Sequence, residues 1–180
     1  MKRSGFSMIE LVFVIVILGV LAAVAVPRFV TTRTDAQVAM ARSDIASVLK
    51  AIPARVFAEN LDPTASTPPG FSSWGEWMID TGGLDRGRWQ SANSIGQLTG
   101  VTAGNAIAPI GNQKQANGNN TSAGCGGIIG IDTNGNLIFN PDGINTQDAS
   151  SKTFCDALKK SYPSGSNRII PLATTGAVKF

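Results

Sequence analysis

The N-terminal part of this chain carries an apolar run that no charged residue interrupts from Leu11 to Pro27. The stretch Phe6–Val26 is 21 residues long, and as a helix rising about 1.5 Å per residue it would span a hydrocarbon core of about 30 Å. A helix that is apolar on every side does not suit the surface of an ordinary globular domain. This segment must therefore contact lipid or other apolar helices.

A single carboxylate, Glu10, lies in the leading edge of the run, where burial in a membrane costs free energy. Two common interpretations of the segment give Glu10 no role. One is a secretory signal peptide, with Lys2 and Arg3 as its basic start and Ala23-Val24-Ala25 as its cleavage site. The other is an uncleaved single-pass anchor.

The residues Gly5-Phe6-Ser7-Met8-Ile9-Glu10-Leu11 resemble the processing motif of type IV pilins and type II secretion pseudopilins. In that family a short basic leader ends in Gly, a Phe follows, and a Glu comes four residues later at the start of an apolar helix. Pro27 lies where the family has a helix-kinking proline. The resemblance covers the chain from Lys2 to about Ala58.

This resemblance implies a processed membrane protein that assembles into filaments. A prepilin peptidase would remove the leader, residues 1–5, by cleavage after Gly5, and Phe6 would be N-methylated. Residues 6–27 would form the transmembrane and assembly helix in the bacterial inner membrane, with a cytoplasmic N-terminus, before the subunit enters a periplasmic or extracellular filament. The implied partners are membrane lipid, the prepilin peptidase, an inner-membrane assembly platform, and copies of itself and other pilins.

The physical chemistry of Glu10 agrees with this implication. Cleavage would leave a cationic α-amino group on Phe6, one helical turn before Glu10. Because filament neighbours are staggered along the axis, the carboxylate of one subunit can meet the amine of the next inside an apolar bundle. Each charge alone costs several kcal/mol to bury, whereas the pair costs far less. Glu10 is therefore predicted to set the register of assembly.

The helical pattern continues over residues 28–58 but becomes amphipathic. Apolar residues recur at helical spacing and form a stripe made of Val38, Ala41, Ile45, Val48, Leu49, Ile52 and Val56. We predict one long helix from Phe6 to near Ala58, with this stripe packed against a sheet. Pro53 is expected to end the helix at Ile52 or to kink it.

Residues 59–180 are predicted to form a small globular extracytoplasmic head. Asn60–Pro69 contains three prolines and predicts a linker. The three tryptophans lie within Phe71–Trp89, and we expect them to be core under a long loop rather than a sugar-binding surface. Asn105–Ala123 is rich in Asn, Gln and Gly and predicts a surface loop.

The C-terminal part of the head has clearer secondary-structure signals. Two β-rich runs flank Asn134-Gly135, which predicts a hairpin with a type I′ turn. A short helix is expected to start at Asp148-Ala-Ser-Ser-Lys152, and strands are expected at Arg168–Leu172 and Ala177–Phe180. A sheet of three or four antiparallel strands packed on the long helix gives an α+β, pilin-like fold.

The chain has two cysteines, Cys125 and Cys155. In an exported protein they predict one disulfide, and the alternative is two buried free thiols. The disulfide would join the start of the hairpin to the short helix. In a chain-entropy model a loop of about 30 residues contributes about 3–4 kcal/mol.

The residue types of the chain do not favour catalysis or cofactor binding. There is no histidine, the commonest general base and metal ligand. Asp132-x-Asn134-Gly135 resembles a fragment of a calcium loop, but Gly143 stands where that loop requires Glu, so calcium is unsupported and no cofactor is predicted. The head has eight basic and nine acidic residues, which argues against direct nucleic-acid binding.

We therefore predict a structural, non-enzymatic subunit of a type IV pilus-like filament, either a type IV pilin or a type II secretion pseudopilin. A DNA-uptake pseudopilin is the alternative within this class. The alternative from another class is an exported or membrane-anchored binding protein, for example for carbohydrate. That protein would use its N-terminus as an ordinary signal peptide or anchor.

Overall fold

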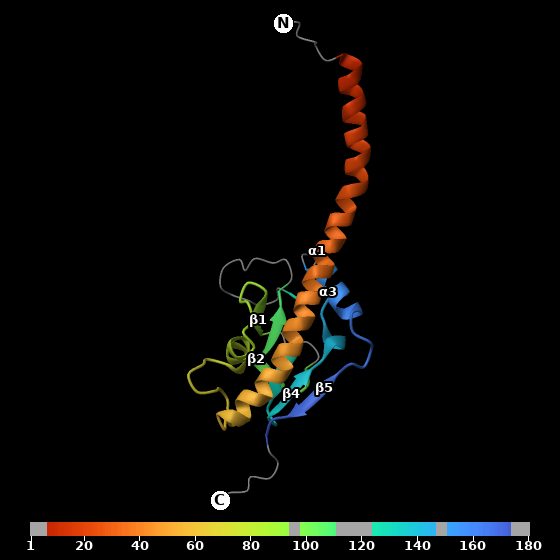
Figure 1. Cartoon of the computed structure of the whole chain (residues 1–180). Coiled ribbons are helices and arrows are strands. Elements are labelled where there is room, and N and C mark those ends of the chain that lie inside the picture. The colour runs from red at the N-terminus through yellow and green to blue at the C-terminus, as the bar shows by residue number, and fades with distance from the viewer. Residues whose placement is uncertain (1–6, 94–97, 111–123, 147–150, 174–180) are drawn as a thin grey trace, which may run out of the picture. The chain divides into compact units, whose positions relative to one another are not determined.

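The computed structural model of the chain describes residues 7–93, 98–110, 124–146 and 151–173, and describes the backbone alone for residues 24–32. The chain divides into two compact units whose boundary falls between Ala36 and Gln37. The second unit holds a sheet and the shorter helices (Figure 1). The predicted segment boundaries at residues 27 and 58 stay predictions.

One helix, α1 (Met8–Ala58), confirms the long N-terminal helix that the apolar pattern predicts. Pro53 does not end it at Ile52, so that alternative is wrong. Pro53 removes one backbone hydrogen bond, but Ile52 and Val56 on either side of it are only 0% and 2% exposed. Their burial in the core holds the last turns of the helix in place.

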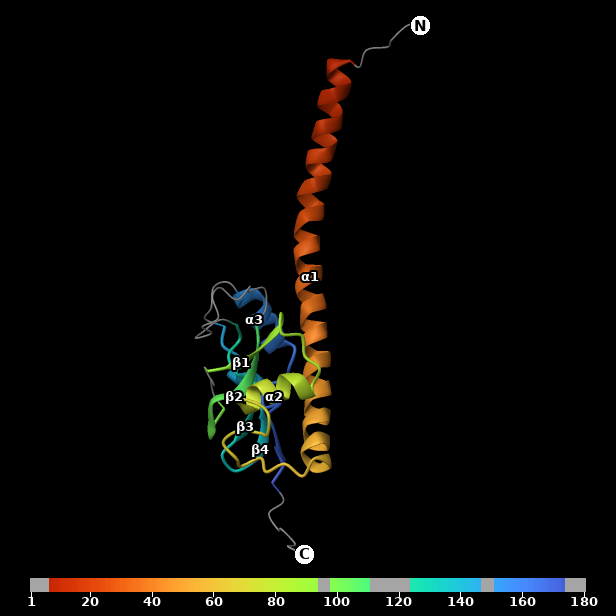
Figure 2. The same cartoon turned by 90° about the vertical axis from the view of Figure 1, so that its left-hand side faces the viewer.

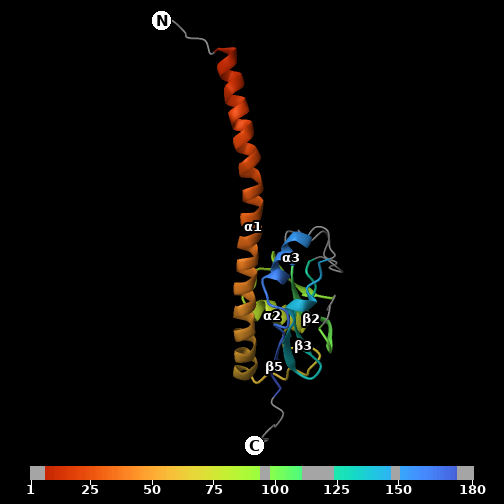
Figure 3. The same ribbon diagram turned by 90° about the vertical axis from the view of Figure 1, so that its right-hand side faces the viewer.

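The apolar stripe of α1 packs on one face of the sheet in the second unit, as predicted (Figure 3). Six of its residues are buried and Leu49 is partly buried. The buried six are Val38, Ala41, Ile45, Val48, Ile52 and Val56. They share one core with sheet residues that include Ile107, Ile129, Ile131, Leu137 and Phe139.

The sheet has five antiparallel strands whose order in space is their order in the chain. The strands are β1 (Trp89–Ala92), β2 (Val101–Pro109), β3 (Ile129–Asp132), β4 (Asn136–Phe139) and β5 (Arg168–Pro171). The α+β class is confirmed, but the predicted sheet of three or four strands is too small. The strand predicted at Arg168–Leu172 is confirmed, whereas Ala177–Phe180 lies outside the described residues.

Strands β1 and β2 were not foreseen, and the surface loop predicted from Asn105 is wrong up to Pro109. Residues 106–109 of β2 are all buried, while residues 111–123 lie outside the described part. The segment lacks a β-rich pattern because its buried positions hold small side chains. Ala106 and Ala108 pack with Ala92, Leu98 and Val101 on the face of the sheet opposite Ile107.

A short helix, α2 (Trp74–Thr81), replaces the loop predicted around the tryptophans (Figure 2). Ser73 caps it, because its hydroxyl accepts a hydrogen bond from the backbone N–H of Glu76 at 3.3 Å. Trp74, Trp77 and Trp89 are each 1% exposed. Their prediction as core is therefore confirmed, and these rings offer no surface to a sugar.

Helix α2 approaches β1 and β2 closely at Gly75. A β-carbon added there would lie 2.7 Å from the backbone oxygen of Ala106, and it would also clash with the backbone oxygen of Gly104. Backbone atoms in a sheet cannot move away cheaply. Glycine is thus the residue that lets the helix lie this near the strands.

We expect Gly75→Ala to destabilise the head by about 1–3 kcal/mol through overpacking, even though alanine favours helices. Urea unfolding, followed by tryptophan fluorescence, measures this change in the free energy of unfolding. Gly87→Ala is the matched control, because its β-carbon would meet only the Asp85 side chain, at 3.2 Å. Equal stability of the two variants would contradict the close-packing argument.

The predicted hairpin of β3 and β4 is present, but the predicted type I′ turn is wrong. The loop has three residues, 133–135, of which Gly135 alone has a positive φ, 76°. The carboxylate of Asp132 explains the difference, because it accepts hydrogen bonds from the backbone N–H groups of Asn134 at 2.9 Å and Asn136 at 2.7 Å. These contacts favour a type I turn closed by a left-handed glycine.

Helix α3 (Lys152–Lys160) follows a single 3₁₀ turn, η1 (Pro141–Gly143). Phe154, Cys155 and Leu158 are buried, as the pattern predicts, while residues 147–150 lie outside the described part. The predicted disulfide between Cys125 and Cys155 is present. It joins the segment before β3 to α3 across 30 residues of chain.

Candidate functional site

The first part of α1, residues 8–23, carries apolar side chains that are exposed in the structure. Every described side chain from Ser7 to Ala23 is exposed, including Leu11 at 58% and Phe13 at 66%. In the part of the chain that the structure describes, no helix has both the length and the apolar character needed to cross a membrane. The predicted membrane crossing therefore stays a prediction.

The carboxylate of Glu10 lies at the N-terminal end of α1. Its Oε2 atom accepts a hydrogen bond from the backbone N–H of Ser7 at 3.1 Å. A carboxylate in the first turn also interacts favourably with the positive end of the helix dipole. Glu10 is thus held next to the position where the chain would begin if it were cut before Phe6.

The other predicted processing residues are not described in the same detail. Gly5 and Phe6 lie outside the described residues, and Pro27 is described by its helical backbone alone. Cleavage after Gly5, methylation of Phe6 and a kink at Pro27 stay predictions. What the structure brings together at this end is an exposed apolar helix and one carboxylate at its start.

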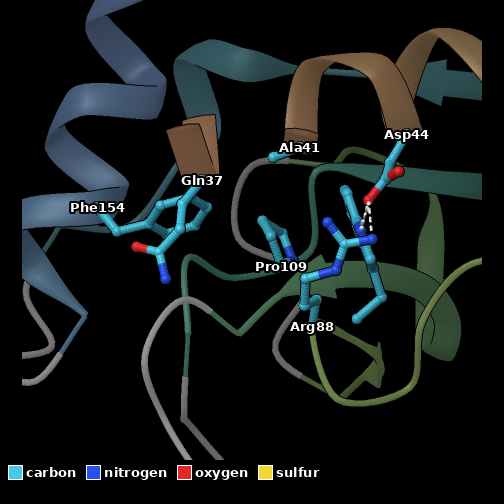
Figure 4. Close-up of a pocket in the computed structure, with 7 residues that line it drawn as sticks. Gln37, Ala41, Asp44, Arg88, Pro109 and Phe154 are labelled. Atoms are coloured by element: carbon cyan, nitrogen blue, oxygen red, sulfur yellow. Dashed lines mark hydrogen bonds and ion pairs between the residues drawn. The ribbon is translucent and has the colours of Figure 1, made fainter. Parts of the chain in front are cut away.

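In the second unit, α1 is tied to the sheet by a polar contact that sequence reasoning missed. Asp44 accepts a hydrogen bond from the indole N–H of buried Trp89 at 2.8 Å, and its Oδ2 lies 3.4 Å from a guanidinium nitrogen of Arg88 (Figure 4). The available signal was an acidic residue directly beside the apolar stripe, which needs a partner when the stripe is buried. This contact fixes how α1 lies over β1.

The cavity beside Asp44 is too small to be a ligand site. It has a volume of about 30 Å³ and is lined by residues that include Gln37, Asp44, Arg88 and Phe154 (Figure 4). That is about the space of one water molecule, whereas small-molecule sites measure hundreds of cubic ångströms. The close-up in Figure 4 therefore shows packing between α1, β1 and α3 rather than a binding pocket.

A second polar cluster joins the end of α1 to the end of α2. The Arg55 guanidinium donates to Glu59 at 2.8 Å and to Asp80 at 3.1 Å, and it lies 5.4 Å from the centre of the Trp77 ring. Its hydrogen bonds to Glu59 and Asp80 raise the pKa of Arg55. Two carboxylates share this one guanidinium, so the cluster carries a net negative charge.

A wide groove of about 420 Å³ lies between α1 and β5. Arg42, Lys50 and Arg168 contribute cations to it, and Tyr162 contributes an aromatic ring. The Arg42 guanidinium lies 5.0 Å from the centre of the Tyr162 ring. Burial raises the pKa of the Tyr162 hydroxyl, against an opposite effect of Arg42 and Arg168, so this side chain is neutral at physiological pH.

The acidic residues near the hairpin act as turn formers. Both carboxylate oxygens of Asp132 accept hydrogen bonds from Asn136, and Asp142 accepts one from the backbone N–H of Gly165 at 2.9 Å. Among the residues that the structure describes, no group of three or more His, Cys, Asp or Glu side chains is placed to hold a metal ion.

Comparisons with known proteins find one family model that matches the N-terminal segment and three similar proteins. Residues 1–26 match the family model of the prokaryotic N-terminal methylation motif. Over 51 residues, 28% of this chain, the sequence is 41% identical to the type II secretion system core protein G of Pseudomonas aeruginosa, and 47% identical to a major component of the type IV narrow pilus of Thermus thermophilus. The chain spans only 36% and 44% of the lengths of these two proteins.

A third similarity extends beyond α1. The chain is 30% identical over 112 residues to fimbrial protein Q of Moraxella bovis, which covers 62% of this chain and 71% of that protein. No solved structure matches the chain. The three relatives are thus named as components of two kinds of assembly, secretion systems and pili or fimbriae.

Proposed function

Because this chain belongs to the family of type IV pilins and type II secretion pseudopilins, we propose that it is a structural subunit of a type IV pilus-like filament and has no enzymatic activity. The observation that carries the proposal is the exposed apolar first part of α1 with Glu10 at its start. Apolar helix surface of this extent needs a partner in water. In a filament, copies of the same helix supply that partner.

The proposal includes the route to the filament. A prepilin peptidase removes residues 1–5 and Phe6 becomes N-methylated, while the apolar segment holds the subunit in the bacterial inner membrane. An assembly platform then moves the subunit into a periplasmic or extracellular filament with other pilins. The motif match over residues 1–26 and the uninterrupted apolar sequence after Glu10 support this route.

We propose either a pilus fibre or a secretion pseudopilus as the filament, because the relatives include a type II secretion system protein and a type IV pilus component. A DNA-uptake pseudopilin is less supported, since the charges of the head nearly cancel. The alternative of a carbohydrate-binding exported protein loses its main support, because the three tryptophan rings are buried. We propose no cofactor, since Asp132 is used by its own turn.

The intact mass and N-terminal sequence of the protein from its native cells test this proposal. We expect a chain that begins at Phe6 and carries one added methyl group, and we expect the unprocessed chain from cells that lack the prepilin peptidase. A chain that begins after Ala25 would identify a signal peptide and would overturn the proposed function. Retention of Met1 in cells with an active peptidase would identify an anchor and would overturn it equally.

A further inference from the structure

The charged side chains of the second unit are segregated, although they nearly cancel in number. Cations gather at the groove between α1 and β5, and carboxylates gather where α1 and α2 end. We propose that the groove receives the acidic patch of a second copy of this chain, and that this contact joins neighbouring heads in the filament. The inference rests on the proposed function and names one partner surface for it.

The groove combines a basic rim with an apolar floor. Arg42, Lys50 and Arg168 are exposed at its rim, and none of them forms an ion pair with a carboxylate in the part of the chain that the structure describes. Ile45 and Phe139 form buried parts of its lining. Three cations without acidic partners repel one another, so a carboxylate from outside is stabilised there.

The acidic patch consists of Glu59 and Asp80, which both contact Arg55, and of Asp62, three residues after Glu59 in the chain. The Glu59 and Asp80 side chains are 46% and 53% exposed although both contact Arg55. Hydrogen bonds from Thr64, first from its hydroxyl and then from its backbone N–H, lower the pKa of Asp62, so it is ionised at physiological pH. Glu59 and Asp80 share one guanidinium, and with Asp62 the patch has more carboxylates than cations, so a cationic partner is stabilised there.

The groove and the acidic patch are placed to meet between two copies of the chain and not within one copy. Glu59 comes 13 residues after Ala46, which lines the groove, so the two surfaces are about 20 Å apart along the helix axis. They cannot meet in the same head, but a copy displaced along the axis brings its groove beside the patch. A contact between two different surfaces repeats from copy to copy, and it generates an open helical array when the rotation between copies does not close a ring.

Charge reversal on each surface, followed by reversal on both, tests the inference in cells that assemble filaments. The groove variant is Arg42→Glu with Arg168→Glu, and the patch variant is Glu59→Lys with Asp80→Lys; Asp62 is left because it caps its own turn. We expect each to reduce sheared filaments at least about tenfold. We expect the chain with all four substitutions to recover most of the loss, because the charges again match.

The matched control is Lys159→Glu with Lys160→Glu, which changes the head charge as the groove variant does but at exposed positions of α3. We expect this control to assemble normally. Full assembly by the groove variant, or failure of the fourfold variant to recover with its disulfide formed, would overturn the inference and leave the proposed function intact. A wild-type chain that is not processed at Phe6 and forms no filament would instead overturn the proposed function.

Discussion

Glu10→Ala is expected to abolish filament assembly while the chain still reaches the membrane. In an apolar bundle the α-amino group of a neighbouring Phe6 would lose its counter-ion, and an uncompensated buried charge costs about 3–5 kcal/mol. That corresponds to a loss of roughly 10²–10⁴ in affinity for each added subunit. Immunoblots of sheared filaments measure assembly, and immunoblots of membranes measure how much of the chain reaches the membrane. Mass spectrometry measures the methylation of Phe6.

The hydrogen bond from Ser7 to Glu10 makes a second variant necessary. Glu10→Gln keeps an acceptor for this N–H but removes the charge, so it separates capping of α1 from pairing with an amine. We expect Glu10→Gln to fail in assembly as Glu10→Ala does. Val16→Ala, at an exposed apolar position of the same helix, should assemble. Normal filaments from Glu10→Gln would show that the ion-pair argument is wrong.

Removal of the disulfide is expected to have the largest effect on the stability of the head. Replacing Cys125 and Cys155 with serine frees a loop of 30 residues, which costs about 3–4 kcal/mol in the chain-entropy model. Both sulfurs are also buried, at 0% exposed, so two hydroxyls would enter an apolar core. Together these effects approach the whole stability of a small domain.

Urea unfolding of the processed chain, with and without reductant, checks this expectation. The wild type should lose stability when it is reduced, whereas the serine variant should not respond to reductant. The reduced wild type should remain more stable than the serine variant, because thiols suit an apolar core better than hydroxyls. If reduction leaves the wild-type midpoint unchanged, the disulfide contributes nothing and the argument fails.

The parts of the fold that follow a strong period were predictable from the sequence. The stripe from Val38 to Val56 has helical spacing because one face of α1 is buried, and the runs around Asn134-Gly135 are rich in β-formers because β3 lies in the core. The turn type was not predictable from Asn-Gly alone. It depends on Asp132, the residue before the turn, whose carboxylate accepts hydrogen bonds from the backbone N–H groups of Asn134 and Asn136.

Helix α2 and strands β1 and β2 were missed for related physical reasons. Gly75 breaks the helical pattern because the helix lies against the strand backbone, and Ala106 and Ala108 weaken the strand pattern because small side chains fill the opposite face of the sheet. The capping pair Ser73 and Glu76 was a usable signal for α2.

The candidate site also has one part that was predictable from the sequence and one part that was not. The motif around Gly5, Phe6 and Glu10 was visible because it is contiguous, whereas the basic groove joins Arg42 to Arg168 across more than a hundred residues. No local pattern connects those two positions. Only the antiparallel meander, which returns β5 to the side of α1, brings them together.

The order of the strands also bears on how the head folds. Each strand pairs with the next one along the chain, from β1 to β5, and the shortest sequence separation is in the hairpin of β3 and β4, where Ile131 pairs with Leu137. Low contact order is associated with fast folding. A head of this kind can begin its sheet at this hairpin and add the remaining strands outward from it, so that at each stage only the two outer strands present an unpaired edge to other copies of the chain.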